Sequence, residues 1–169
     1  MKSWFLFILA FFFSKAFSQN EFAASVFYND FKKIHADALQ GFSKYKGSKK
    51  LGKNNTAREE YRIKLLLPLA DSGHIVFPSI DKPYAEFFFQ TANTKKQIDQ
   101  RAVNLREALL TAYEQPLSTR TESSLTKGNI FSNTYFFTTQ EDKLAIFKIS
   151  IYQVDKRYYL TLRMMGNKE

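Results

Sequence analysis

Residues Thr94–Pro116, with the sequence TKKQIDQRAVNLREALLTAYEQP, decide the fold because they form the clearest helix pattern in the chain. Their apolar residues recur at steps of four, three, four and three, which places them on one helical face: Ile98, Ala102, Leu105, Leu109 and Ala112. Thr94 and Gln97 fit a capping box at the start. Pro116 cannot continue the hydrogen-bond ladder. The sequence therefore predicts a helix from Thr94 to about Glu114.

Three strands are predicted before this helix, over residues 61–69, 74–80 and 84–91. The first alternates between apolar and polar residues, and turn residues separate it from the next two. Pro78 and Pro83 weaken the second strand, because proline cannot donate to the ladder. We therefore expect the second strand to be an edge strand or a broken segment.

Three more strands are predicted after the helix, over residues 129–139, 144–154 and 158–165. The links between them are short, and short links make neighbouring strands antiparallel. In the last strand, Tyr158 shares one face with Leu160, Leu162 and Met164. Residues 117–128 are polar and are predicted to be turn-like. The C-terminal third is thus predicted to be an antiparallel meander.

A further helix is predicted over residues 21–42, because Phe27, Phe31 and Ile34 lie on one helical face. The predicted element order is α-β-β-β-α-β-β-β. Such elements predict an α+β fold in which two helices pack on one face of a mostly antiparallel sheet. We expect Phe31, Leu105 and Leu109 to be buried where the helices meet the sheet.

The chain begins with the pattern of a secretory signal peptide, predicted over residues 1–18. Lys2 precedes an unbroken apolar run from Trp4 to Phe13, and Ala16 and Ser18 form a small-residue cleavage site. Ten apolar residues are too few to cross a bilayer, which takes about 20 in a helix. No later segment is apolar enough, so no transmembrane segment is predicted. Residues 19–169 are predicted to form a single α+β domain.

Cleavage is predicted between Ser18 and Gln19, so the exported protein should begin at or near Gln19. N-terminal sequencing of the exported protein measures this directly. A membrane-bound protein that still begins with Met1 would contradict the prediction.

The composition favours a periplasmic or secreted protein with an acidic partner. The chain has no cysteine, which fits a bacterial envelope better than a eukaryotic secretory route. Of its 25 basic residues, Lys2 and Lys15 lie in the signal segment, and the other 23 exceed the 16 acids by seven. An excess of this size is also typical of an ordinary soluble surface.

A basic segment lies between the first helix and the first predicted strand, over residues 43–58. It is predicted to be a mobile loop, because it is rich in glycine, lysine and asparagine and poor in apolar residues. Its basic residues are candidates for binding an anionic lipid or polysaccharide surface: Lys44, Lys46, Lys49, Lys50, Lys53 and Arg58. A solvated loop without a ligand is the alternative. Export makes nucleic acid a poor partner, and none is predicted.

Two resemblances bear on the fold. The element order resembles that of type III secretion chaperones and other small α+β adaptor domains. The chain also resembles small uncharacterised exported proteins of Bacteroidota-like bacteria, through the segments 41–47 (GFSKYKG) and 65–68 (LLLP) and the capped helix after Thr94. The resemblance implies an α+β fold and an exported location, and it implies no catalytic residues.

No catalytic, cofactor or metal signature appears in the sequence, so no cofactor is expected. The two histidines, His35 and His74, have Asp37 and Asp71 nearby, but a zinc site needs three or four ligands. Both are predicted to be solvated surface residues. The first functional hypothesis is a non-enzymatic exported binding or adaptor domain with a protein partner. The second is an envelope-associated module that uses residues 44–58. A hydrolase with scattered catalytic residues is the third, favoured if His74 meets a carboxylate in a pocket.

Overall fold

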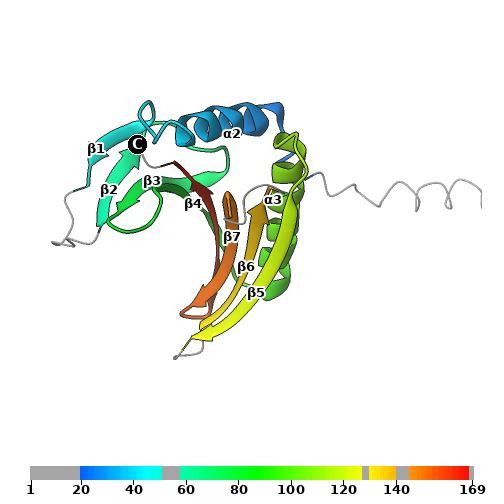
Figure 1. The fold of residues 1–169 in the computed structure, drawn as a ribbon. Coiled ribbons are helices and arrows are strands. Elements are labelled where there is room, and N and C mark those ends of the chain that lie inside the picture. Colours follow the sequence, from blue (N-terminus) through cyan, green and yellow to red (C-terminus); the bar gives the residue numbers. More distant parts are fainter. Residues whose placement is uncertain (1–19, 51–57, 127–129, 140–144, 168–169) are drawn as a thin grey trace, which may run out of the picture.

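A computed structural model describes residues 20–50, 58–126, 130–139 and 145–167. They form an α+β fold with two helices and one eight-stranded sheet, in the order β1-β2-β3-β4-β8-β7-β6-β5 (Figure 1). Every neighbouring pair is antiparallel. The predicted α+β class, with two helices and an antiparallel sheet, is confirmed. The predicted signal segment lies outside the described residues.

The helices and strands have the following bounds: α2 Ser25–Ala38, β1 Lys46–Lys49, β2 Arg58–Ile63, β3 Ala70–Pro78, β4 Tyr84–Ala92, α3 Lys95–Ala112, β5 Ser118–Thr126, β6 Ile130–Thr138, β7 Phe147–Val154 and β8 Arg157–Met165. Neither described helix combines the length and apolar character that a membrane span requires. The predicted meander is present as β6, β7 and β8. The β7–β8 turn uses positive φ angles at Asp155 and Lys156, which suit a tight hairpin.

The predicted element order is wrong, because each half of the chain holds four strands instead of three. β1 lies within the expected loop 43–58, and β5 lies within the expected turn-like segment 117–128. Both are edge strands of the sheet. An edge strand needs no alternating apolar pattern where neither of its faces is deeply buried. These two strands therefore show little of the alternation between apolar and polar residues on which the strand prediction depended.

The expectation that the second predicted strand is an edge is also wrong. The strand observed there, β3, lies between β2 and β4. Pro78 is its last residue, and Pro83 lies in the turn before β4, so neither proline interrupts the middle of the ladder. The first strand ends earlier than predicted: β2 stops at Ile63, whereas the prediction extended to Leu69. Leu69 has a φ of 66°, which is not a strand conformation.

The α3 helix begins as predicted. The Gln97 backbone N–H donates to the Thr94 hydroxyl oxygen at 3.3 Å. The Thr94 hydroxyl in turn donates to the Gln97 side chain at 3.0 Å, so the two residues are linked in both directions. The predicted apolar face is buried, including Leu105 and Leu109, which are both 0% exposed. This face packs against β4, β7 and β8.

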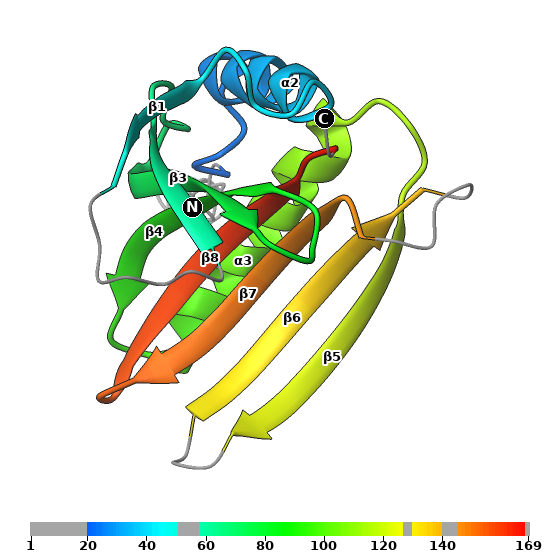
Figure 2. The same ribbon diagram turned by 60° about the vertical axis from the view of Figure 1, so that its left-hand side comes forward.

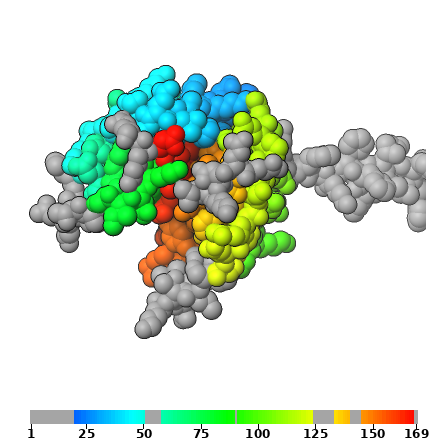
Figure 3. Space-filling view, in the orientation of Figure 1, coloured from blue at the N-terminus to red at the C-terminus, as the bar shows by residue number. Residues whose placement is uncertain are grey.

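One hydrophobic core lies between the helices and one face of the sheet. The ring centroids of Phe31 in α2 and Phe147 in β7 are 5.2 Å apart. Phe22, just before α2, meets Phe89 of β4 at 5.4 Å. Figure 2 shows α3 behind β7 and β8, with α2 across one end of the sheet. The space-filling view shows the blue residues of α2 at that end (Figure 3). Neither of the two described helices covers the other face of the sheet, which we call the open face (Figure 2).

Asp37 joins the end of α2 to the chain that leads into β1. Its carboxylate is 3% exposed. One oxygen accepts the backbone N–H of Lys44 and the other accepts that of Tyr45, each at 2.8 Å. This side chain therefore ties residues 44–45 to the helix, and the beginning of the expected mobile loop is held in place.

His35 lies in an aromatic cluster instead of on the solvated surface where it was predicted. Its ring is stacked on Phe31 at 6.2 Å and lies 5.2 Å from Tyr113 and 5.3 Å from Phe147. Burial among these rings disfavours the charged form and lowers the pKa of His35 from its usual 6.5.

Acidification should therefore destabilise the protein through His35. Below pH 6.5 the unfolded chain binds a proton at this residue, and the folded chain does not. The free energy of unfolding therefore decreases as the pH is lowered, until the pKa of the folded state is reached. Urea unfolding of wild type and of His35→Phe at pH 7.5 and 5.5 measures the effect. The variant should lose less stability between the two values. An equal loss in both proteins would contradict the prediction.

Candidate functional site: the open face of the sheet

A row of polar and charged side chains crosses the open face of the sheet. Residues directly opposite one another on antiparallel strands point to the same face. The register places six such residues side by side on β3, β4, β8, β7, β6 and β5: His74, Glu86, Arg163, Lys148, Phe136 and Arg120. Their neighbours along each strand face the core, as Phe87 and Leu162 do. We call this set the central row.

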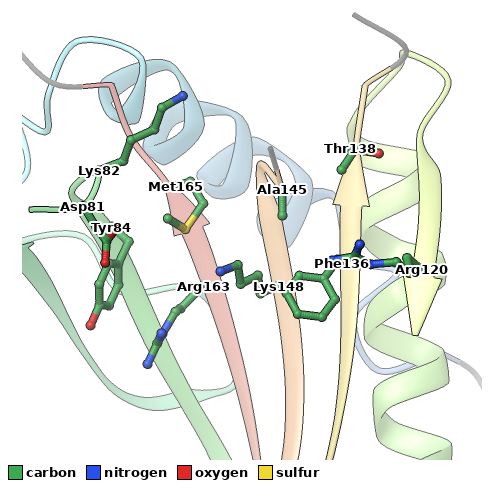
Figure 4. A pocket seen from close by; sticks show the side chains of 10 residues that line it. All are labelled: Asp81, Lys82, Tyr84, Arg120, Phe136, Thr138, Ala145, Lys148, Arg163 and Met165. Atoms are coloured by element: carbon green, nitrogen blue, oxygen red, sulfur yellow. The ribbon is translucent and has the colours of Figure 1, made fainter. Parts of the chain in front are cut away.

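Part of the central row lies in a hollow of about 660 Å³. This volume is within the range of small-molecule sites, about 300–1,000 Å³. Figure 4 shows Tyr84 on one flank, Phe136 and Arg120 on the other, and Arg163 and Lys148 between them. The lining holds four basic residues and one acid: Lys82, Arg120, Lys148, Arg163 and Asp81. The hollow is therefore basic, with an aromatic ring on each flank.

Lys148 stands at the middle of this hollow. Its ammonium nitrogen lies 5.3 Å from the centre of the Phe136 ring, and the Arg120 guanidinium lies 5.1 Å from the same ring. Burial, and then the nearby charge of Arg163, lower the pKa of Lys148, and the charges of Asp81 and Glu122 offset part of this effect. Among the described residues, Lys148 forms no ion pair. A half-buried ammonium beside a second cation gains from an added anion.

Arg163 is held by a carboxylate. Its Nε donates to Glu86 Oε1 at 2.7 Å, and its guanidinium lies 4.5 Å from the centre of the Tyr84 ring. The other Glu86 oxygen is 3.4 Å from His74 Nε2. Burial alone would raise the pKa of Glu86, but hydrogen bonding to His74 and the charge of Arg163 together hold it below 4.5. Arg163 is thus fixed in direction, while 42% of its side chain stays exposed toward the hollow.

The predicted surroundings of His74 were wrong. It is not solvated, because its side chain is 14% exposed, and its partner is Glu86 rather than Asp71. His74 does not line the hollow, so the arrangement that would favour a hydrolase, a histidine and a carboxylate in one pocket, is not formed there. Within the described part of the chain, no three histidine, aspartate or glutamate residues gather as metal ligands.

Five of the six predicted basic residues lie among the described residues, in or next to β1 and β2. Four have partners: Lys49 pairs with Glu59, Arg58 pairs with Glu60, and the ammonium groups of Lys44 and Lys46 lie over Tyr45 and Phe77. The hydrogen bond to Glu59 raises the pKa of Lys49. Lys50 is exposed, and Lys53 lies outside the described residues. The structure therefore brings four of the six to nearby acids and rings.

The residues that line the hollow were not identified from the sequence. Lys148 and Arg163 are each flanked by apolar residues in a strand, and this is the signal that was available. A charge within a strand marks a face that is not packed in the core. It does not tell which charges from other strands will stand beside it, because that depends on the register of five strands.

Comparison with known proteins adds no name to this site. No protein-family model matches the chain, and no significant match is found among curated proteins or among solved structures.

Proposed function

We propose that this protein is an exported binding domain and that the hollow on the open face of its sheet binds an anionic ligand. The observation that carries the proposal is Lys148, a half-buried ammonium without an ion-pair partner among the described residues. Arg163 is its neighbour on one side in the central row, and Arg120, which pairs with Glu122, lies beyond Phe136 on the other side. A carboxylate or phosphate placed there would accept charge-assisted hydrogen bonds from more than one strand.

The rings on the flanks favour a ligand that is flat or partly apolar beside its anionic group. Tyr84 and Phe136 both line the hollow. Burial raises the pKa of Tyr84, so its hydroxyl is a neutral donor at physiological pH. The hollow thus offers cations for an anionic group and two ring surfaces for the rest of the molecule.

The second proposal is that residues 44–58 bind an anionic envelope surface, and it has weaker support. Lys49 and Arg58 are already paired with Glu59 and Glu60, so an external anion would have to compete with those carboxylates. Binding to a protein partner stays a prediction. A partner that presents a carboxylate to the hollow would fit both this prediction and the proposal that the hollow binds an anion.

Benzoate is a suitable first probe, because it joins a carboxylate to one ring. Calorimetric titration of the full chain should show saturable binding that weakens as sodium chloride is raised, since screening reduces charge attraction. Lys148→Met removes the ammonium but keeps a long side chain, and it should weaken binding about tenfold, which corresponds to about 1.4 kcal/mol. Lys96→Met changes an exposed lysine on α3 and should leave binding unchanged.

Two results would count against the proposal. One is a benzoate affinity that is equal in Lys148→Met and wild type. The other is a loss of affinity that is the same in the Lys96→Met control, which would show a dependence on net charge and not on the hollow.

A further inference from the structure

The open face changes in character along the strands, away from the central row. The next row, two residues further along β6, β7 and β8, consists of hydroxyl side chains: Thr134 and Ser150, which are partly exposed, and Thr161, which is 4% exposed. The hydroxyls of Thr134 and Ser150 are 3.2 Å apart and share a hydrogen bond. Two residues further along β7 and β8, Tyr152 lies directly opposite Tyr159. The face therefore carries a basic row, a hydroxyl row and a tyrosine pair.

The tyrosine pair is a second aromatic surface on this face, made of two rings stacked on each other. Its ring centroids are 5.2 Å apart and its planes differ by 8°. Both side chains are partly exposed. Burial is the main cause of the raised pKa of Tyr152; the charges of Glu86 and Tyr159 raise it further, and the charge of Arg163 lowers it. Tyr152 is thus close enough to the central row for the charges of Glu86 and Arg163 to affect its pKa.

The spacing of these rows suits a ligand longer than one ring. Strands advance about 3.3 Å per residue, so Lys148 and Tyr152 are about 13 Å apart along β7. A ligand that reaches both must be anionic at one end, rich in hydroxyl partners in the middle and flat at the other end. The hydrogens on one face of a sugar ring meet the negative face of an aromatic ring favourably. Sugar hydroxyls donate and accept, as the side chains of the hydroxyl row do.

We propose that the open face binds an acidic oligosaccharide of about three sugars, with a uronate carboxylate at Lys148 and a neutral sugar on the Tyr152–Tyr159 pair. This inference rests on the proposed function, because it uses the same hollow, and it adds the class of ligand and a second contact surface. The partly exposed hydroxyls of Thr134 and Ser150 bind the sugar between them.

Single-stranded nucleic acid is the nearest alternative, since bases also stack on aromatic side chains. It would place a phosphate near the hydroxyl row, where β6, β7 and β8 carry Thr134, Ser150 and Thr161 and no cation. The neighbour of this row on β5 is Glu122, which lies opposite Thr134 and would repel a phosphate. A ligand with its charge confined to one end matches the face better than one charged at every unit.

The test compares a glucuronate-terminated glucose trisaccharide with the same trisaccharide after reduction of its carboxyl group to an alcohol. In calorimetry with the full chain, the acidic trisaccharide should bind at least tenfold more tightly than the reduced one and at least tenfold more tightly than glucuronate alone. Tyr159→Thr removes the ring, puts a residue with high strand propensity in its place and should lower the trisaccharide affinity to that of glucuronate. Tyr159→Phe keeps the ring and should retain the affinity, and both variants should bind benzoate as wild type does.

The outcomes separate this inference from the proposed function. Benzoate binding that depends on Lys148, together with equal affinity for the acidic and reduced trisaccharides, would overturn the inference and leave the proposed function standing. So would an unchanged trisaccharide affinity in a folded Tyr159→Thr variant. Tighter binding of a nine-nucleotide oligothymidylate, lost in Lys148→Met and Tyr159→Thr, would overturn it in favour of nucleic acid. No binding of benzoate or of either trisaccharide to wild type would overturn both.

Discussion

Asp37→Ala should lower the free energy of unfolding by about 3 kcal/mol, because two backbone N–H groups would lose a charged acceptor at once. Both carboxylate oxygens of Asp37 are used, one by Lys44 and one by Tyr45, and the side chain is 3% exposed. Water cannot replace the carboxylate fully at such a site. Urea unfolding followed by circular dichroism measures the loss.

Two variants make this prediction specific. Asp37→Asn keeps one acceptor oxygen and should lose about half as much stability. Asp30→Ala removes an acid of the same helix whose partner is the exposed Lys33, and it should cost less than about 1 kcal/mol. If Asp37→Ala and Asp30→Ala are equally stable, Asp37 does not hold the segment that leads into β1.

Lys148→Glu should abolish measurable benzoate binding. The variant loses a charge-assisted hydrogen bond, for which about 1.5–3 kcal/mol is typical, and adds repulsion between two carboxylates. A loss of about 3 kcal/mol in total corresponds to more than a hundredfold in affinity. Arg163 lies directly opposite position 148 and keeps 42% of its side chain exposed, so it can approach the new carboxylate and the fold should be kept.

Calorimetry on the folded variant measures this loss, and a thermal melt checks folding. Lys96→Glu, on the exposed surface of α3, is the control with the same change in net charge, and it should bind benzoate within about threefold of wild type. Binding to Lys148→Glu at wild-type affinity would show that the anion does not lie in the hollow.

The parts of the fold that the sequence predicts are those with a strong local pattern. The α3 helix has a capping box, a regular apolar face and a proline that follows it, and all three act within one segment. The alternation of β8 likewise indicates which side chains face the core, and Leu160, Leu162 and Met164 are buried. These signals depend on near neighbours in the chain, so no knowledge of the fold is required to interpret them.

The edge strands and the candidate site depend on residues far apart in the sequence. β5 consists mainly of serine, threonine and charged residues, and its structure comes from pairing with β6 along nine residues. The hollow requires Arg120, Phe136, Lys148 and Arg163 to stand side by side, and only the strand order β8-β7-β6-β5 brings them together. The prominent cluster of lysines near residue 46 is a local signal, and its charges meet Glu59 and Glu60 across the β1–β2 pair and within β2.

The most direct test of the proposed site is a map of backbone amide chemical shifts during a titration of the full chain with benzoate. The largest changes should fall on the strand residues around the hollow, at Tyr84, Phe136, Lys148 and Arg163. Residues 44–50 should change little. Changes centred on residues 44–50, with none around Lys148, would contradict the account and would favour the basic segment as the anion site.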